Sequence, residues 1–248
     1  MDLGISGRRA AVAASSRGLG FATAAALARE GVQVALCGRD AGRVEEAAAK
    51  IGAGAVPLVA DVGTAAGATG FVAAATEALG GIDILVANAG GPPAGDFASV
   101  DDVEAYARAF ELNALSAIAM CKAVVPAMQA AGWGRVLAIT SVAVRQPIPT
   151  LILSNTARSG LTGFLKTLAR EVARDGVTVN SIQPGFHATE RITSLHADTS
   201  ALAATVPAGT IGDAEDFGAV AAFLCSEPAR YVTGVALPVD GGANAGLQ

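Results

Sequence analysis

A glycine-rich turn near the start of the chain has the residue types and spacing of a phosphate-binding site. Its sequence is Ala13-Ala14-Ser15-Ser16-Arg17-Gly18-Leu19-Gly20. Glycines let the backbone approach a pyrophosphate closely, and the free N–H groups at the start of a helix attract anions. Tight turns also use a Gly-x-Gly pair. The position of this pair directly after the first predicted strand favours phosphate binding.

Side chains that could hold a metal or form disulfides are scarce. The chain has three cysteines, Cys37, Cys121 and Cys225, and two histidines, His187 and His196. An odd number of widely spaced cysteines predicts small buried apolar side chains in a reducing compartment rather than disulfides. Two histidines are too few for a histidine-rich metal site. We therefore expect no bound metal.

The elements that must position the turn alternate between short apolar runs and longer alanine-rich stretches. The apolar runs predict strands at residues 9–14, 32–37, 56–60 and 84–87, within 133–140, and at 177–182 and 235–239. Helical spacing predicts helices at residues 21–30, 40–51, 65–79, 103–130, 154–174 and 214–226. Pro126 predicts a bend or a break in the fourth helix, because proline lacks the N–H that a helix needs.

The order of these elements predicts the fold class. Alternating strands and helices predict an α/β fold, a doubly wound parallel sheet with helices on both faces. Continuous apolar runs such as Ile84-Leu85-Val86 are typical of strands buried on both sides. We find no linker, repeat or low-complexity segment, so residues 1–248 are interpreted as a single dinucleotide-binding domain.

Composition and charge exclude several classes of protein. The chain is 52% apolar and 16% charged, with a formal net charge of −5, which argues against disorder and against nucleic-acid binding. No charge-free stretch reaches the roughly 20 apolar residues of a membrane span. The apolar run after Arg8-Arg9 ends at Ser15, too early for an export signal. We expect a cytoplasmic protein with neither nucleic-acid nor membrane partners.

Further motifs follow the later predicted strands. They are Asn88-Ala89-Gly90, Asn113 in the long helix, Ser141, Pro184-Gly185 and Asp240-Gly241-Gly242. In this order, and over essentially the whole chain, they resemble the short-chain dehydrogenase/reductase family, closest to its 3-oxoacyl-ACP reductase-like members. The resemblance implies a Rossmann-type sheet with a nicotinamide cofactor at the carboxyl ends of its strands. It also implies that Asn113 and Ser141 are the catalytic asparagine and serine.

The resemblance implies a set of cofactor-binding residues as well. These are Ser15, Ser16, Arg17, Gly18, Leu19, Gly20, Arg39, Asp61, Val62, Asn88, Ala89, Gly90, Arg158, Pro184, Gly185, His187 and Thr189. Asp61 is expected at the adenine. The family's usual Thr-Gly at the start of the turn is Ala13-Ala14 here, and alanine is more restricted in φ than glycine.

The chain departs from the family where its catalytic tyrosine and lysine belong. Alignment of the helix after Ser141 puts Ser154 at the tyrosine position and Arg158 at the lysine position; the chain's two tyrosines, Tyr106 and Tyr231, lie far away in sequence. A serine hydroxyl is shorter and much less acidic than a tyrosine, whose pKa is about 10. Arginine keeps the positive charge and can donate to a ribose, but its pKa of about 12 or more prevents it from passing protons.

Few side chains could replace the missing acid. His187 is either a proton donor beside the nicotinamide or a residue that lines the loop. Ser141 could polarise a substrate carbonyl, and Ser154 could hold a water. Arg145 is either an anion anchor or a solvated loop residue. The predicted lid, residues 189–207, contains few distinctive groups and leaves the substrate open.

Two function classes remain open. The first is an NAD(P)(H)-dependent oxidoreductase that acts on a carbonyl or alcohol substrate through an atypical active site. The second is a non-catalytic NADP-binding sensor or partner subunit of the same fold. Sites that prefer NAD usually carry an acid after the second strand, whereas Cys37-Gly38-Arg39 stands there. Arg17 and Arg39 could bind a 2′-phosphate, so we expect NADP(H), with NAD(H) as the alternative.

The sequence also predicts self-association. Residues 103–120 and 154–168 carry many small side chains, which permit close contact between helices. The apolar run at residues 235–239 could pack across a two-fold axis. Members of the family usually pair through these segments. A homotetramer or a homodimer is therefore expected, the alternative being that these faces only cover the sheet.

Overall fold

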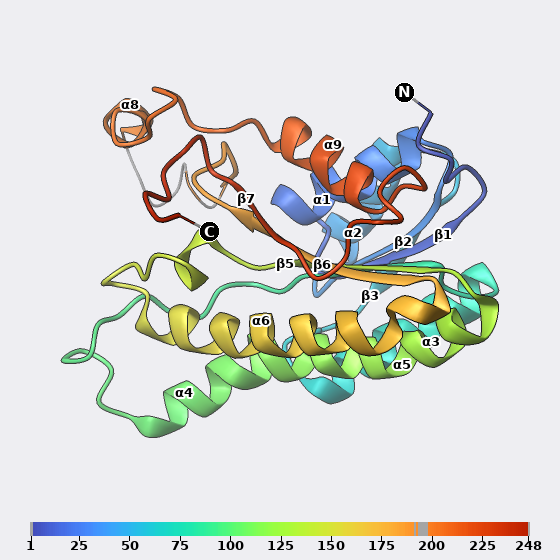
Figure 1. The fold of residues 1–248 in the computed structure, drawn as a ribbon, viewed down its shortest axis with the longest axis horizontal. Coiled ribbons are helices and arrows are strands. Elements are labelled where there is room, and N and C mark those ends of the chain that lie inside the picture. Colours follow the sequence, from blue (N-terminus) through green and yellow to red (C-terminus); the bar gives the residue numbers. More distant parts are fainter. Residues whose placement is uncertain (1, 191, 193–197, 248) are drawn as a thin grey trace.

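The computed structural model describes residues 2–190, 192 and 198–247, which form a seven-stranded parallel sheet between two layers of helices (Figure 1). The strand order is β3-β2-β1-β4-β5-β6-β7. The strands are β1 (Arg9–Val12), β2 (Gln33–Gly38), β3 (Ala55–Val59), β4 (Ile84–Ala87), β5 (Gly134–Ile139), β6 (Val177–Pro184) and β7 (Ala236–Val239). The predicted fold class is confirmed.

The helices divide between the two faces of the sheet (Figure 1). On one face lie α1 (Gly18–Arg29), α2 (Ala41–Ile51) and α9 (Ala214–Leu224). On the other lie α3 (Ala65–Leu79), α4 (Val103–Phe110), α5 (Ser116–Ala131) and α6 (Ile152–Val172). A short helix, α8 (Thr199–Ala203), follows the loop after β6.

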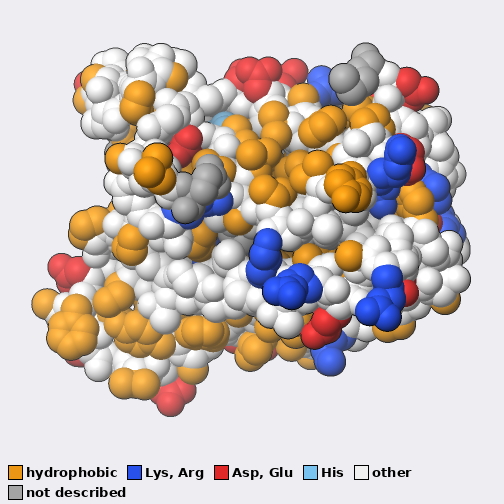
Figure 2. All heavy atoms as spheres, viewed as in Figure 1, with side chains coloured by type: hydrophobic (Ala, Val, Ile, Leu, Met, Phe, Trp, Pro, Cys, Tyr) orange, Lys and Arg blue, Asp and Glu red, His pale blue; other side chains and the backbone are white. Residues whose placement is uncertain are grey.

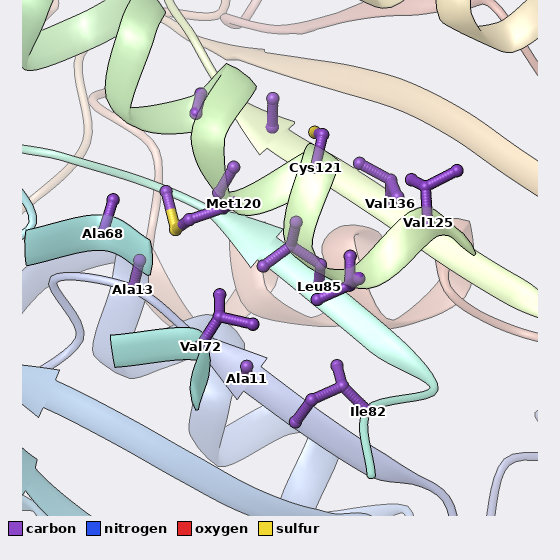
Figure 3. Packing of buried hydrophobic residues seen from close by; sticks show 14 of the residues in the cluster. Ala11, Ala13, Ala68, Val72, Ile82, Leu85, Met120, Cys121, Val125 and Val136 are labelled. Atoms are coloured by element: carbon purple, nitrogen blue, oxygen red, sulfur yellow. The ribbon is translucent and has the colours of Figure 1, made fainter. Parts of the chain in front are cut away.

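Alternate residues of the central strands fill two apolar cores. Leu85 of β4 packs with Val72 of α3 and Met120 of α5 (Figure 3). Its neighbours Ile84 and Val86 belong to the opposite core, beneath α1 and α9. Because side chains of a strand alternate between its two faces, a strand covered on both faces is apolar throughout.

The long helical region after β4 differs from its prediction. Helix α5 continues through Pro126 to Ala131, so proline does not break it. The irregularity lies earlier, at a π-helical turn over Glu111–Leu115 that joins α4 to α5. A π turn inserts one extra residue into a helix and is frequent at functional sites. Asn113 lies within this turn.

The first strand is also shorter than predicted. It ends at Val12, because Ala14 has a φ of +46°, the one positive value for a non-glycine residue among those described. Of the described helices, only the stretch Val103–Ala131 is long and apolar enough to cross a membrane. Met120 and Cys121 on this stretch are buried against the sheet, so its apolar character is that of a core helix.

Candidate active and cofactor site

The predicted site residues converge on one edge of the sheet. The glycine-rich turn follows β1, and residues 88–90 follow β4, where the chain switches from one side of the sheet to the other. Ser141 follows β5 and Gly185 follows β6. In doubly wound sheets, ligands bind outside the carboxyl ends of the strands at such a switch point. The fold therefore brings the two groups of motifs to the carboxyl end of the sheet, where a ligand crevice is expected; we call this region the crevice.

The start of α1 fits a pyrophosphate. No side chain caps this helix and no acidic residue lies in its first turn, so its leading N–H groups are available to an anion. Gly18 has a φ of +61°, and a Cβ placed on it would meet nothing closer than 3.9 Å. A Cβ on Gly20 would lie 2.6 Å from the carbonyl oxygen of Ala14, so only glycine allows α1 to pack here.

Two polar side chains shape this turn. The Ser15 hydroxyl donates to the carbonyl of Val12 at 2.6 Å and accepts from the backbone N–H of Cys37 at 3.2 Å. Asn88 Nδ2 donates to the carbonyls of Ala13 at 3.3 Å and Ala14 at 3.1 Å. Ser15 is fully buried. Both side chains therefore fix the backbone.

Arginines surround the end of β2, where a ribose 2′-substituent is expected. Arg17 Nη1 forms an exposed ion pair with Glu190 at 2.8 Å. Arg39 is exposed and has no ion-pair partner among the described residues. Ser16 faces Gly38, on which a Cβ would lie 2.8 Å from the serine oxygen. This close packing brings the first turn next to the end of β2.

A pocket of about 280 Å³ opens between β3 and α3 beside Asp61. Asp61 is exposed, and its Oδ1 accepts from the N–H of Gly63 at 2.9 Å. The side chain of Val62 is buried in the apolar core, so only its backbone can face a ligand. This arrangement is compatible with an adenine at Asp61.

Asn113 lies in the π turn, and a side-chain hydrogen bond ties it to the loop after β4. Its Nδ2 donates to the carbonyl of Gly90 at 2.8 Å. Its Oδ1 is buried and has no hydrogen-bond partner among the described residues. A buried acceptor of this kind needs a water or a ligand. The amide can therefore hold a water at the crevice.

Ser141 begins a short 3₁₀ turn, Val142–Val144, directly after β5. Its Oγ accepts from the N–H of Ala143 at 3.1 Å. The hydroxyl proton is not used in this bond, because an oxygen that accepts can still donate. Ser141 can therefore donate a hydrogen bond to a substrate oxygen.

Ser154 and Arg158 lie one turn apart on α6, and each is 8% exposed. Arg158 Nη1 donates to the carbonyls of Ile139 and Thr140, each at 3.0 Å. These are the two residues before Ser141. The guanidinium therefore places a positive charge at the end of β5 and fixes the backbone that carries Ser141.

His187 is buried, with 4% of its surface exposed. Its ring lies edge-on to Phe217 of α9, with centroids 5.1 Å apart, and a Cβ on Gly212 would lie 2.8 Å from its Nε2. Burial lowers the pKa of the imidazole, which keeps it neutral at physiological pH. These contacts favour a packing role, and the role of proton donor stays a prediction.

Two contacts were not foreseen from the sequence. Arg145 is partly buried and anchored within the protein, because its Nε donates to Gln183 Oε1 at 2.8 Å and its Nη2 to the carbonyl of Ala236 at 2.5 Å. Gln183 is fully buried and its Nε2 has no partner among the described residues. The sequence signal available for this contact was a polar residue, Gln183, directly before Pro184-Gly185 at the end of a predicted strand.

The remaining predictions concern cysteines, metals and the lid. Cys37, Cys121 and Cys225 are buried, as predicted, and burial raises the pKa of each thiol to about 12. Among the described residues, no cluster of three or more His, Cys, Asp or Glu side chains could hold a metal ion. Residues 191 and 193–197 of the predicted lid, including His196, lie outside the described residues.

Comparison with known proteins supports the same crevice. A family model described as Enoyl-(Acyl carrier protein) reductase matches residues 13–244. Dehydrogenase/reductase SDR family member 4 of Homo sapiens is 36% identical over 241 residues, which are 94% of this chain and 86% of the human protein. The 3-oxoacyl-[acyl-carrier-protein] reductase of Escherichia coli is 35% identical over 237 residues, 95% of this chain and 97% of the bacterial enzyme.

A solved structure shares the whole architecture. L-sorbose reductase from Gluconobacter frateurii, complexed with NADPH and L-sorbose, has a TM-score of 0.93 and 32% identity, covering 100% of both chains. The matched family model runs from the glycine-rich turn to beyond β7, and thus includes both walls of the crevice. The chain therefore belongs to the short-chain dehydrogenase/reductase family of oxidoreductases.

Proposed function

We propose that this protein is an NADP(H)-dependent oxidoreductase for a carbonyl or alcohol substrate, with Ser154 and Arg158 in place of the family's tyrosine and lysine. The observation that carries the proposal is the position of Arg158, bonded to the two residues before Ser141. A cation and a hydroxyl donor thus flank one point of the crevice. The NADPH and L-sorbose bound by the similar reductase support the proposal.

Cofactor binding is assigned to both walls of the crevice. The first turn of α1 would bind the pyrophosphate, Asp61 the adenine, and the loop after β6 the nicotinamide end. We assign Arg17, Arg39 and Arg43 to the ribose 2′-position, and their charge favours NADP(H) over NAD(H) because guanidinium binds phosphate strongly. The other proposed contacts are Ser15, Ser16, Gly18, Leu19, Gly20, Val62, Asn88, Ala89, Gly90, Arg158, Pro184, Gly185, His187 and Thr189.

The chemistry divides between the cofactor and the protein. The nicotinamide, when bound, supplies or accepts the hydride. Ser141 donates a hydrogen bond to the substrate oxygen, and the positive charge of Arg158 stabilises negative charge that develops on it. Asn113 Oδ1 and the Ser154 hydroxyl hold water beside this oxygen. Solvent delivers the proton, because burial lowers the pKa of His187 and thus disfavours the protonated imidazolium that could donate it.

Turnover of NADPH and NADH against a panel of ketones, imines and 3-oxoacyl thioesters tests the proposal. We expect oxidation of NADPH with at least one class. Ser154→Tyr combined with Arg158→Lys tests the atypical site directly, since it restores the family's pair. Ser159→Tyr is the matched control, because Ser159 lies on the same helix and is exposed. If the two variants turn over the panel at equal rates, the assignment of Ser154 to the site is contradicted.

One alternative function is a non-catalytic NADP-binding sensor or partner subunit. It is favoured by the absence, among the described residues, of a side chain that clearly replaces the family's tyrosine as proton donor. A protein of this kind would bind NADPH tightly and turn over no member of the panel. Calorimetric titration on the same preparation separates the two functions. Tight binding with no turnover supports the alternative, and equal or tighter NAD binding contradicts the NADP preference.

We also propose a homotetramer or homodimer in the cytoplasm. Apolar side chains gather over the α4 region (Figure 2), where Phe97 is 83% and Val103 78% exposed. Burial of such surface between copies would be favourable, since each Å² of apolar area contributes about 25 cal/mol. Light scattering at micromolar concentration tests this, and a monomer contradicts it. Phe97→Ser should shift the protein towards the monomer.

A further inference from the structure

Glu190 reaches across the cofactor crevice. It lies in the loop after β6, and its Oε2 accepts from Nη1 of Arg17, at the start of α1, at 2.8 Å. The preceding residue, Thr189, also lies against the glycine-rich turn, since its Cγ2 would be 3.9 Å from a Cβ on Gly18. Two successive residues of this loop thus lie beside the turn after β1, and Glu190 bonds to it.

The Glu190 carboxylate lies in a cluster of positive charge. We define the arginine cluster as Arg17, which directly precedes α1, Arg39, which directly follows β2, and Arg43, in the first turn of α2. The hydrogen bond from Arg17 lowers the pKa of Glu190, and the charge of Arg43 lowers it further. Arg39 stands at the exposed end of β2, beside Gly38. These are the groups that our proposed function assigns to the 2′-phosphate.

We propose that Glu190 competes with the 2′-phosphate of NADP(H) for the arginine cluster and thereby limits the preference for NADP(H) over NAD(H). This inference rests on the proposed binding of NADP(H). A 2′-phosphate bound by Arg17 would need the guanidinium donor that the Glu190 carboxylate occupies. NAD(H) has a 2′-hydroxyl there and leaves the Arg17–Glu190 ion pair intact. Glu190 therefore opposes only the phosphorylated cofactor.

The size of the effect follows from exposure of the pair. The side chains of Arg17 and Glu190 are 58% and 64% exposed. An exposed ion pair of this kind changes an equilibrium constant by about two- to fivefold, and salt weakens it. We expect the competition to be strongest at low ionic strength.

Glu190→Gln tests the proposal, with Glu215→Gln as the matched control. Glu215 forms an exposed ion pair with Arg29 at 3.5 Å, on α9 and α1, and its substitution changes the net charge equally. Dissociation constants for NADPH and NADH are measured by fluorescence titration at low and at moderate salt. We expect E190Q to bind NADPH about two- to fivefold more tightly and NADH unchanged, with no effect of E215Q.

The effect of Glu190→Gln measured in an Arg17→Ala protein distinguishes competition for Arg17 from other effects of the substitution on cofactor binding. In an Arg17→Ala protein, Glu190→Gln should have less effect on NADPH binding, because the shared guanidinium is gone. Equal NADPH binding by E190Q and E215Q overturns the proposal. Weaker binding of both cofactors by E190Q also overturns it, since the pair would then retain bound cofactor. Failure of the parent protein to bind NADPH in calorimetry removes the proposed cofactor function and this inference together.

Discussion

The two walls of the crevice use their side chains in different ways. At the turn after β1, Ser15 and Asn88 fix the backbone and leave the N–H groups of α1 for the ligand. At the end of β5, the charged side chain of Arg158 is buried and donates to the carbonyls of Ile139 and Thr140. Backbone amides and cations suffice to bind a phosphate. Polarisation of a substrate oxygen instead depends on particular side chains. We therefore expect substitution at the β5 wall to change chemistry while the turn after β1 keeps its binding geometry.

The largest expected effect is on catalysis at the β5 wall. Ser141→Ala should lower kcat by about 10²–10³, because it removes the donor to the substrate oxygen. Ser154→Ala should have a smaller effect, since it removes only a contact to water. Steady-state turnover of NADPH measures both, after titration has shown that each variant binds cofactor. An equal loss in the two variants contradicts the ranking.

A second test concerns the buried cation. Arg158→Met should lower the free energy of unfolding by about 2–4 kcal/mol, because it removes a charged donor from two buried carbonyls. Arg170→Met, on the exposed face of the same helix, should change it by less than about 0.5 kcal/mol. Urea denaturation provides the measurement. An Arg158 variant as stable as the Arg170 control would show that the guanidinium does not fix this wall.

The pH dependence of stability tests the burial of His187. In the unfolded chain an imidazole has a pKa near 6.5, whereas burial in the fold lowers the pKa of His187. As the pH falls below about 6.5, the unfolded chain binds more protons and the fold loses stability, by at most about 1.4 kcal/mol per pH unit. His187→Gln should flatten this slope between about pH 7.5 and pH 5.5.

The same variant decides the proton-donor hypothesis for His187. From the sequence, loss of this side chain should cut turnover strongly. From its contacts with Phe217 and Gly212, turnover at neutral pH should change little. A turnover loss as large as that of Ser141→Ala would restore the hypothesis and place a proton source at the β6 loop.

The smallest expected effect is at the turn after β1. Ala14→Gly should raise the free energy of unfolding by about 0.5 kcal/mol, because the left-handed conformation at φ +46° strains alanine and glycine adopts it freely. The gain is limited by the greater freedom of glycine in the unfolded chain. Ala13→Gly, at the fully buried neighbour, should instead destabilise. Equal changes in the two variants would show that φ strain is not the cause.

Local pattern alone determined the sheet, its helices and the place of the glycine-rich turn. Apolar runs of strand length and helical spacing depend on neighbouring residues, so they can be read in order along the chain. The same local order placed Ser154 and Arg158 one turn apart on a helix after Ser141. The resemblance of the motifs then predicted the family, which the comparisons confirm.

Tertiary structure alone decided how several of these side chains are used. The ring of His187 packs on Phe217, Arg145 bonds to Gln183, and Arg17 meets Glu190, a residue 173 positions away. The extra residue of the π turn at Glu111–Leu115 likewise has no periodic signal. Such contacts depend on which elements the sheet order makes neighbours. Strand and helix periodicity reports which face of an element is buried, but not which partner covers it.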